Sequence, residues 1–474
     1  MLRPLREHAL LSLIVVSSRT ALHFAGVRFN FNLDWMWLSD PADLRDRLLE
    51  TLYYFHAFPP GMNLVTGILL KLGGSHAATL ALATFWVLGL VLVNSLFYLS
   101  RVSGLPTPVA LGVAVTFSLL PQSIYFEHLY IYEYPIAALL CLAAVFFYKA
   151  VQRQSFWVWV AFFFICSAIG LTRSTFHLVW FVAMVGLGVM FTPRDVRRRI
   201  LFAACGPAAL LLALYLKNFA VFGVFDAFTF GPVSQDLVTI WHLPVEVRDS
   251  WIEEGKLSPF AAVSVYAGPR EYLPFFGTSE NKDWPPQLNL LERPSVKAGN
   301  YNHWFFLEVN RRRRADALYY VRARPFDYAA NVLEGLKDMF TPSTRWHPLD
   351  DTDESPHYQH RQVLGRYEAF YNRVVHGFPV SPVGLYAFLP LVLVWTFRRA
   401  TSLVRTGGTD ATARGALLSF CLFQIGFVVA ASSLFTFRES ARYRYQVEAM
   451  IWLIMALCLF SLWRSLVDRV RLPP

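Results

Sequence analysis

The sequence predicts an all-α polytopic membrane protein with about ten transmembrane helices. The chain is 55% hydrophobic and only 16% charged, whereas a soluble chain of 474 residues carries more charge. Its apolar residues gather in runs close to the roughly 20 residues that a helix needs to cross the hydrocarbon. The net charge of +10 comes from short clusters beside those runs, as the positive-inside bias produces, so it indicates a membrane partner and no nucleic acid.

Ten apolar runs are the expected spans: 8–27, 77–99, 105–121, 134–150, 155–171, 175–192, 200–222, 381–397, 414–436 and 446–463. The first run follows Arg3 and Arg6, and no small-residue cleavage site comes after it. We therefore expect a retained first span, a cytoplasmic N-terminus and a multi-pass protein of the plasma (inner) membrane. All five cysteines fall within apolar runs, where they are expected to pack as small side chains.

Segment 59–73 is apolar but short, and it starts with two prolines. If it does not cross, the later basic clusters share the side of Arg3 and Arg6; these are Arg101, Lys149, Arg153, Arg194, Arg197, Arg198, Arg199, Arg398, Arg399, Arg405, Arg464, Arg469 and Arg471. If it crosses, all of them move outside. The positive-inside rule therefore predicts an interfacial or re-entrant helix here.

This topology divides the chain into three parts. Residues 1–222 form an N-terminal transmembrane module whose first outer region is 28–76, and residues 381–474 hold the last transmembrane helices. The part between them, 223–380, is rich in proline and glycine and holds most of the acidic residues. We expect a large extracytoplasmic loop domain there, with helices near 307–324 and 326–339.

The first outer loop, residues 34–61, is long and acidic, and it includes Asp34, Asp40 and His56. Its apolar residues recur at helical spacing, which predicts an amphipathic helix lying on the membrane surface; they are Leu44, Leu48, Leu49, Leu52 and Tyr53. An ordinary polar loop with an interfacial helix explains the same spacing equally well. Metal ligation by Asp34, Asp40 and His56 is conceivable, but their spacing is not diagnostic.

Further polar clusters follow on the same side of the predicted membrane: Glu127, His128 and Glu133; Arg173 and His177; Lys217 and Asn218; Arg438, Arg442 and Arg444. Acids at a membrane boundary need a polar role or a cationic partner, although a solvated loop is the alternative. A single interfacial arginine such as Arg173 is often a snorkelling anchor. The terminal arginines lie outside against the charge bias, which indicates an anion such as a lipid phosphate.

Arg442 and Arg444 stand two residues apart, so they share a face only in extended chain. We therefore expect an extended or irregular turn that lets both side chains reach one phosphate. The run Arg311–Arg314, in contrast, is typical of a solvated helix face. The chain has no phosphate-cradling glycine-rich loop, no HExxH and no GxSxG, so nucleotide hydrolysis, zinc peptidase and serine hydrolase functions lack their motifs.

Taken in order, several motifs resemble the GT-C superfamily of polytopic glycosyltransferases: the acidic first outer loop, the His-x-x-Pro-Pro at His56, the acidic second loop, Leu-Thr-Arg at Arg173, Asn-x-x-x-Phe-Gly at Asn218, and Glu-x-x-Arg-Tyr-Arg at Glu439. The resemblance implies a polyprenyl-phosphate-sugar donor and an acceptor that is a glycan, a lipid or a protein. It implies that Asp34 or Asp40 is the general base of an inverting transfer. It also implies that Glu127 or Glu133 orients the acceptor or a divalent cation.

In that family pattern the donor phosphate would be held by Arg173, Lys217, Arg442 and Arg444. A lipid-phosphate leaving group needs such cationic stabilisation, and the acceptor hydroxyl needs a carboxylate in hydrogen-bond reach. Two other functions remain open: a transporter or flippase for an anionic substrate, and a non-catalytic assembly protein of similar fold. Transporters place polar residues at mid-bilayer on broken helices, whereas here the predicted spans are clean.

Overall fold

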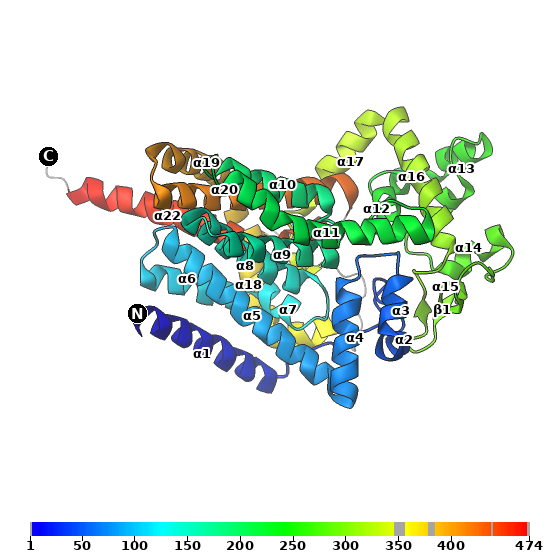
Figure 1. The fold of residues 1–474 in the computed structure, drawn as a ribbon, viewed down its shortest axis with the longest axis horizontal. Coiled ribbons are helices and arrows are strands. Elements are labelled where there is room, and N and C mark those ends of the chain that lie inside the picture. Colours follow the sequence, from blue (N-terminus) through cyan, green and yellow to red (C-terminus); the bar gives the residue numbers. More distant parts are fainter. Residues whose placement is uncertain (1, 346–355, 378–383, 438, 472–474) are drawn as a thin grey trace.

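The computed structural model describes residues 2–345, 356–377, 384–437 and 439–471. Apart from one short hairpin, the regular structure in these residues is helical (Figure 1). The α-helices are α1 Leu2–Phe24, α2 Pro41–Asp46, α3 Leu48–Tyr53, α4 Gly61–Gly73, α5 Ala77–Val102, α6 Thr107–Leu119, α7 Pro121–Glu127, α8 Glu133–Arg153, α9 Phe156–Thr172, α10 Leu178–Met190, α11 Arg197–Phe222, α12 Gly231–Asp236, α13 Val245–Glu253, α14 Pro269–Phe276, α15 Pro286–Asn289, α16 Phe305–Ala323, α17 Pro325–Asp338, α18 Pro356–His376, α19 Leu389–Thr406, α20 Thr409–Phe435, α21 Ser440–Tyr445 and α22 Glu448–Arg471.

Short 3₁₀ turns and one hairpin complete the described chain. The 3₁₀ turns are η1 Gly74–His76, η2 Ile240–His242, η3 Pro259–Ala262, η4 Ser343–Arg345 and η5 Leu385–Phe388. Strands β1 Glu292–Arg293 and β2 Ala298–Gly299 pair antiparallel. The hairpin lies next to the first outer loop, and it matters for the site because it supplies Arg293 (Figure 1).

Within the described residues, six helical segments are long and apolar enough to cross a membrane: Gly61–Val102, Glu133–Arg153, Arg197–Phe222, Leu385–Thr406, Thr409–Phe435 and Glu448–Arg469. A seventh arises if α6 and α7, bent by 58°, form one broken span. Helices α9 and α10 are apolar but shorter, with 17 and 13 residues. The chain is therefore built as a multi-pass membrane protein, with six or seven candidate spans.

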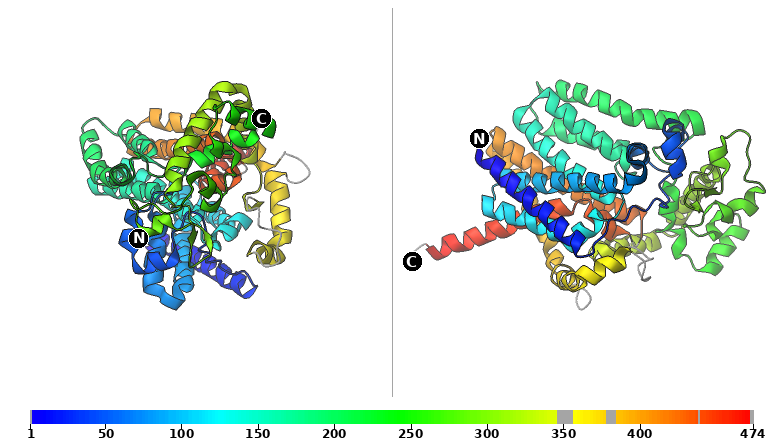
Figure 2. Two further views of the ribbon diagram at one scale, coloured as in Figure 1. Left: turned by 90° about the vertical axis from the view of Figure 1, so that its right-hand side faces the viewer. Right: turned by 90° about the horizontal axis from the view of Figure 1, so that it is seen from below.

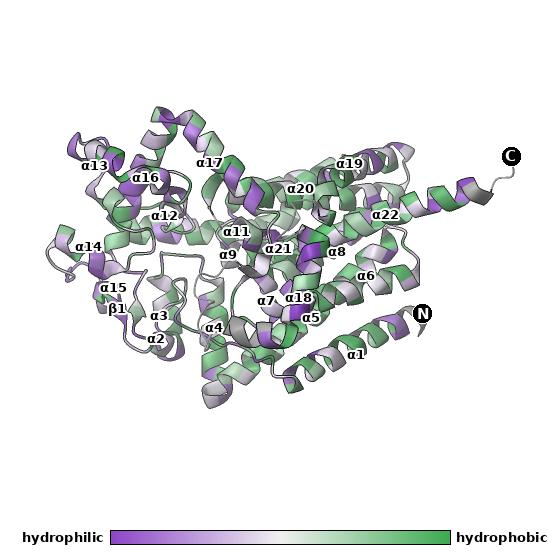
Figure 3. Cartoon of the chain, turned by 180° about the vertical axis from the view of Figure 1, so that it is seen from behind, coloured by the Kyte–Doolittle hydropathy of each residue, from purple (hydrophilic) through white to green (hydrophobic). Residues whose placement is uncertain are grey.

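The long helices pack side by side around one large apolar core. Helices α5, α9 and α20 all pack against α8, which lies at the centre of the bundle (Figures 1 and 2). Residues 231–338 gather at one end of the molecule, and we call them the end group (Figure 1). They have apolar clusters of their own, around Phe305 and around Tyr320. The end group is more hydrophilic than the long helices (Figure 3).

Helices α16 and α17 confirm the two helices expected near 307–324 and 326–339. The expectation that Arg311–Arg314 is a solvated face is wrong for Arg313. That side chain is only 1% exposed and forms an ion pair with buried Asp236, while its three neighbours point outward. Helix α18 lies outside the end group and packs against α7 and η5 beside the bundle.

The first outer loop departs from the single amphipathic helix that its spacing predicts. Two short helices, α2 and α3, replace it, and Arg47 breaks the helical path between them with φ −130° and ψ 41°. Leu44 and Leu48 pack toward α4, close to Gly67, where a Cβ would meet Leu48. Leu49 remains exposed. Packing of Leu44 and Leu48 against α4 therefore outweighs the tendency of this segment to form one continuous amphipathic helix.

Segment 59–73 forms α4, which η1 joins to α5. Together they make one apolar stretch of 42 residues, Gly61–Val102. At about 1.5 Å per residue this exceeds twice the hydrocarbon thickness of roughly 30 Å, so it cannot be one straight span. Gly74, with φ 51°, separates the two helices, and Figures 1 and 2 show them running in different directions.

The extended turn expected around Arg442 and Arg444 is wrong. Residues Ser440–Tyr445 form helix α21, whose side chains are all buried. On a helix, residues two apart point roughly 200° apart. The two arginines accordingly reach different partners in this structure, so they do not share the face that extended chain would give them.

Candidate functional site

Arg173 is the centre of the candidate site. Helix α9 ends at Thr172, and Arg173 continues in extended conformation as its C-cap. The guanidinium lies between two aromatic rings, 4.0 Å from the centroid of Tyr132 and 4.3 Å from that of Tyr443. Although only 4% of Arg173 is exposed, its Nε and Nη2 have no hydrogen-bond partner in the described chain. A buried guanidinium with unused donors can still donate hydrogen bonds to a further acceptor.

Glu133 lies beside Arg173 at the start of α8. Its carboxylate is fully buried and stands 3.8 Å from Nη2 of Arg173 and 3.2 Å from Nε of Arg442. Arg442 also pairs with the more exposed Glu439 at 2.8 Å. The two arginines and two glutamates balance in formal charge. An anion bound there would therefore depend on the directed N–H donors of Arg173 more than on net charge.

A small cavity opens in front of Arg173, and we call it the arginine cavity. It is lined by Trp37, Phe58, Pro59, Met62, Tyr132, Thr172, Arg173 and Ser174. Trp37 stacks on Trp35 at 4.8 Å and packs against Tyr132 at 4.7 Å, so aromatic rings connect the first outer loop to Arg173. The cavity volume is about 10 Å³, roughly the room of one water. A phosphate requires its walls to move apart.

Arg293, from strand β1, fixes the first outer loop over this cavity. Its Nη1 donates to the carbonyl oxygens of Leu33, Trp35 and Leu38, and its Nη2 donates to that of Asp34. Burial lowers the pKa of Arg293, while the charges of Asp34 and Asp40 oppose that shift. Sequence reasoning missed this residue, because its partners lie more than 250 positions away along the chain.

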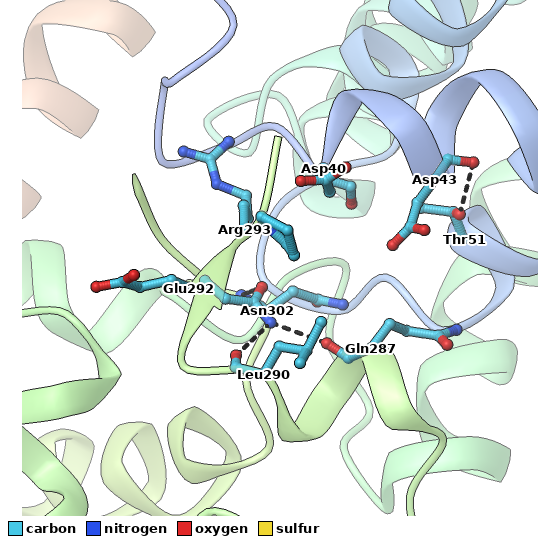
Figure 4. Close-up of a pocket in the computed structure, with 11 residues that line it drawn as sticks. Asp40, Asp43, Thr51, Gln287, Leu290, Glu292, Arg293 and Asn302 are labelled. Carbon is cyan, nitrogen blue, oxygen red and sulfur yellow. Dashed lines mark hydrogen bonds between the residues drawn. The ribbon is translucent and has the colours of Figure 1, made fainter. Parts of the chain in front are cut away.

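The two candidate bases of the first loop differ in their surroundings. Asp40 caps α2 by accepting from the Ala42 amide, and it also accepts from the Ser295 amide and hydroxyl at 2.8 and 2.6 Å. It lines a polar cavity of about 20 Å³ between the first loop and the β1 region, with Asp43, Arg293 and Asn302 nearby (Figure 4). Asp34 is exposed, and its carboxylate has no hydrogen bond or ion pair with a described residue.

His56 and Lys217 form a second polar group on the other side of the first loop. His56 Nδ1 lies 2.8 Å from the Thr229 hydroxyl, and the Nζ of Lys217 donates to the Phe55 carbonyl at 2.6 Å. Burial, reinforced by the charge of Lys217, lowers the pKa of His56 to about 3. His56 is therefore a neutral buried imidazole, and Lys217 ties α11 to the loop.

The remaining predicted residues contact other groups of the protein. Glu127 pairs with Arg19 of α1, with 2.8 Å from Nε to Oε2, and both are buried. His128 binds the Ile124 carbonyl through Nδ1, and burial lowers its pKa. His177 caps α10 through the Val179 amide, and burial lowers its pKa too. Asn218 donates to the Asp226 carbonyl.

Arg444 belongs to a separate network away from Arg442. It pairs with Glu448 at 2.9 Å and donates to the carbonyls of Met339 and Thr341. Glu448 also meets Tyr386 and Gln122. Arg438 lies outside the described residues. The structure thus brings Glu133, Arg173 and Arg442 together and separates them from Arg444, from His56 with Lys217, and from Glu127.

One of the missed residues, Arg19, had a signal in the sequence. Arg19 interrupts the first apolar run, and a charge within a candidate span is itself an indication of a buried partner. Tyr132 and Trp37 had no such signal, because aromatic residues are common at membrane boundaries. The described residues hold no group of three His, Cys, Asp or Glu side chains that could bind a metal ion. Comparison with protein-family models, curated proteins and solved structures found no match to this chain.

Proposed function

We propose that this chain is a membrane-embedded glycosyltransferase that moves a sugar from a polyprenyl-phosphate donor to an acceptor at the outer membrane boundary. The observation that carries the proposal is Arg173, a buried arginine that keeps two N–H donors unpaired within the described chain and lines a cavity beneath an acidic loop. Such a fork of donors suits a phosphate, and the aromatic rings around it suit a sugar or a prenyl chain. The sugar and the acceptor are left open.

Asp34 is the better candidate for the base. The hydrogen bonds that Asp40 accepts already engage both of its oxygens, whereas the carboxylate of Asp34 is free and stands on the loop that covers the arginine cavity. In the proposed reaction, Asp34 takes the proton of the acceptor hydroxyl as its oxygen attacks the anomeric carbon. The bond from that carbon to the phosphate oxygen breaks on the opposite face, so the configuration inverts. Polyprenyl phosphate leaves as an anion held by Arg173.

Turnover can be followed without identifying the product, by supplying an extract of membrane lipids, glycans and proteins as acceptor and measuring the release of polyprenyl phosphate from a panel of polyprenyl-phosphate sugars. Asp34→Asn removes the base and keeps the shape, so it should lower the rate by about 10²–10⁴-fold. Asp40→Asn is the matched control on the same loop and should keep most of the rate. Equal losses in the two variants would contradict the assignment of Asp34. No release with any donor would favour transport or a non-catalytic assembly role.

The proposed topology has the N-terminus in the cytoplasm, about ten spans including the shorter helices, α4 at the interface, and the end group outside. A cysteine introduced near Lys71 should then react with an impermeant reagent from outside, and one near Arg101 should not. Labelling from outside near Arg101 would overturn this arrangement.

A further inference from the structure

Helix α18 presents an apolar stripe whose side chains are at least one third exposed in the described structure. Val363, Tyr367, Phe370 and Val374 follow the 4-3-4 spacing that places residues on one helix face. Phe370 is 66% exposed and Val374 is 51% exposed. Single exposed apolar residues are ordinary, but a continuous stripe along three turns needs a nonaqueous neighbour.

The other two faces of α18 indicate what that neighbour is. Tyr371, Asn372 and Val375 are buried against the protein, so this face fixes the helix in place. Exposed Arg366 and Arg373 lie seven residues apart, hence on one line along the edge of the apolar stripe. An apolar face bordered by arginines is typical of a helix lying in the surface of a membrane with anionic headgroups.

The contacts of α18 place it at the depth where candidate spans begin. Tyr371 meets Gln122 at 2.5 Å, and Gln122 reaches Glu448, the first residue of the Glu448–Arg469 span, at 3.3 Å. Tyr386, near the start of the Leu385–Thr406 span, contacts the same Glu448. Figure 2 shows α18, in yellow, on the flank of the bundle. A helix at that level and on that flank lies against the boundary between headgroups and acyl chains.

We propose that α18 is an interfacial anchor that binds anionic phospholipids, with its apolar stripe among the upper acyl carbons and Arg366 and Arg373 at the phosphates. The phosphate is a good partner for an arginine because it accepts two N–H donors of the guanidinium at once. This inference rests on the membrane helices and does not depend on the proposed transfer reaction.

The test uses the full chain in lipid nanodiscs, with a nitroxide attached to single introduced cysteines in a Cys205→Ser background. Accessibility of each label to oxygen, which concentrates in acyl chains, is compared with accessibility to a water-soluble nickel chelate. Labels at Phe370→Cys and Val374→Cys should favour oxygen, as should the control Leu391→Cys on the exposed face of α19. A label at Lys282→Cys, on an exposed loop, should favour nickel.

The charge requirement is tested by lipid composition. Adding phosphatidylglycerol to phosphatidylcholine nanodiscs should move the Val374 label deeper, and the Arg366→Gln, Arg373→Gln double variant should lose that shift. Nickel-accessible labels on the stripe would overturn the anchor in favour of an aqueous surface. Labels reached by neither reagent would overturn it in favour of a protein partner. An unchanged depth with phosphatidylglycerol would overturn the anionic-lipid specificity.

Discussion

Arg173 and Arg313 are both buried arginines beside a buried acid, yet their surroundings differ. Arg313, in the end group, pairs with Asp236 and donates to the Phe260 and Val263 carbonyls and the Tyr272 hydroxyl. Arg173 has two aromatic rings within 4.3 Å, a carboxylate at 3.8 Å and two N–H donors left unpaired by the described residues, and it lines a cavity. The number of partners within the chain therefore separates an arginine that holds the fold from one available to a ligand.

The largest expected effect is on the stability side of this comparison. Arg313→Leu leaves Asp236 buried without its cation, so the free energy of unfolding should fall by about 3–5 kcal/mol. Arg312→Leu, on the exposed face of the same helix, should cost far less, because an exposed ion pair contributes little to stability. Chemical unfolding in detergent measures both. Similar losses for the two variants would mean that the Arg313 cluster does not hold the end group together.

The second-largest expected effect is on the affinity of Arg173 for its proposed ligand, polyprenyl phosphate. Arg173→Lys keeps the charge but replaces the two-donor fork with a point charge, so affinity for polyprenyl phosphate should fall. Loss of a charged hydrogen bond predicts a weakening of about 1.5–3 kcal/mol, or roughly 10–150-fold in Kd. The melting temperature should change little, because no hydrogen bond of Arg173 within the described chain is lost.

Arg398→Lys, on an exposed helix face, is the matched control and should bind polyprenyl phosphate like the wild type. A lower melting temperature with unchanged affinity for Arg173→Lys would place Arg173 with Arg313, as a structural arginine.

Arg442→Ala should affect both the melting temperature and the affinity for polyprenyl phosphate, because Arg442 pairs with both Glu133 and Glu439 beside Arg173. Its loss should lower the melting temperature and disturb the neighbouring Arg173.

The sequence predicts the helices of this chain better than the site. Apolar runs and helical spacing are local signals, so the long helices and α16 and α17 follow from them directly. The role of a buried arginine is not local. Arg293 and Arg313 acquire their partners only when distant segments meet, and residues around Arg313 look like a solvated face until Asp236 is placed against it. Arg442 and Arg444 diverge because packing favours the helix α21 over extended chain.

His56 is a third kind of buried polar group, because its imidazole is neutral and has no ion-pair partner among the described residues. The change in stability expected from it is the smallest of those predicted. Its pKa of about 3 in the folded protein is below the roughly 6.5 of an unfolded histidine, so below pH 6.5 the unfolded chain binds an extra proton. The free energy of unfolding should therefore fall as the pH drops, by about 1.4 kcal/mol from His56 between about pH 7.5 and pH 5.5. The His56→Asn variant has no titrating group at this position, so its free energy of unfolding should depend less on pH by that amount.

The Thr229 hydroxyl can still form a hydrogen bond to the asparagine, which limits the loss of stability caused by the substitution itself. His303, whose pKa burial lowers to about 4, remains in both proteins and cancels in the comparison. Parallel pH curves would mean that His56 takes up a proton in the folded state, as it would if the neighbouring Lys217 were neutral or if an anion bound beside it.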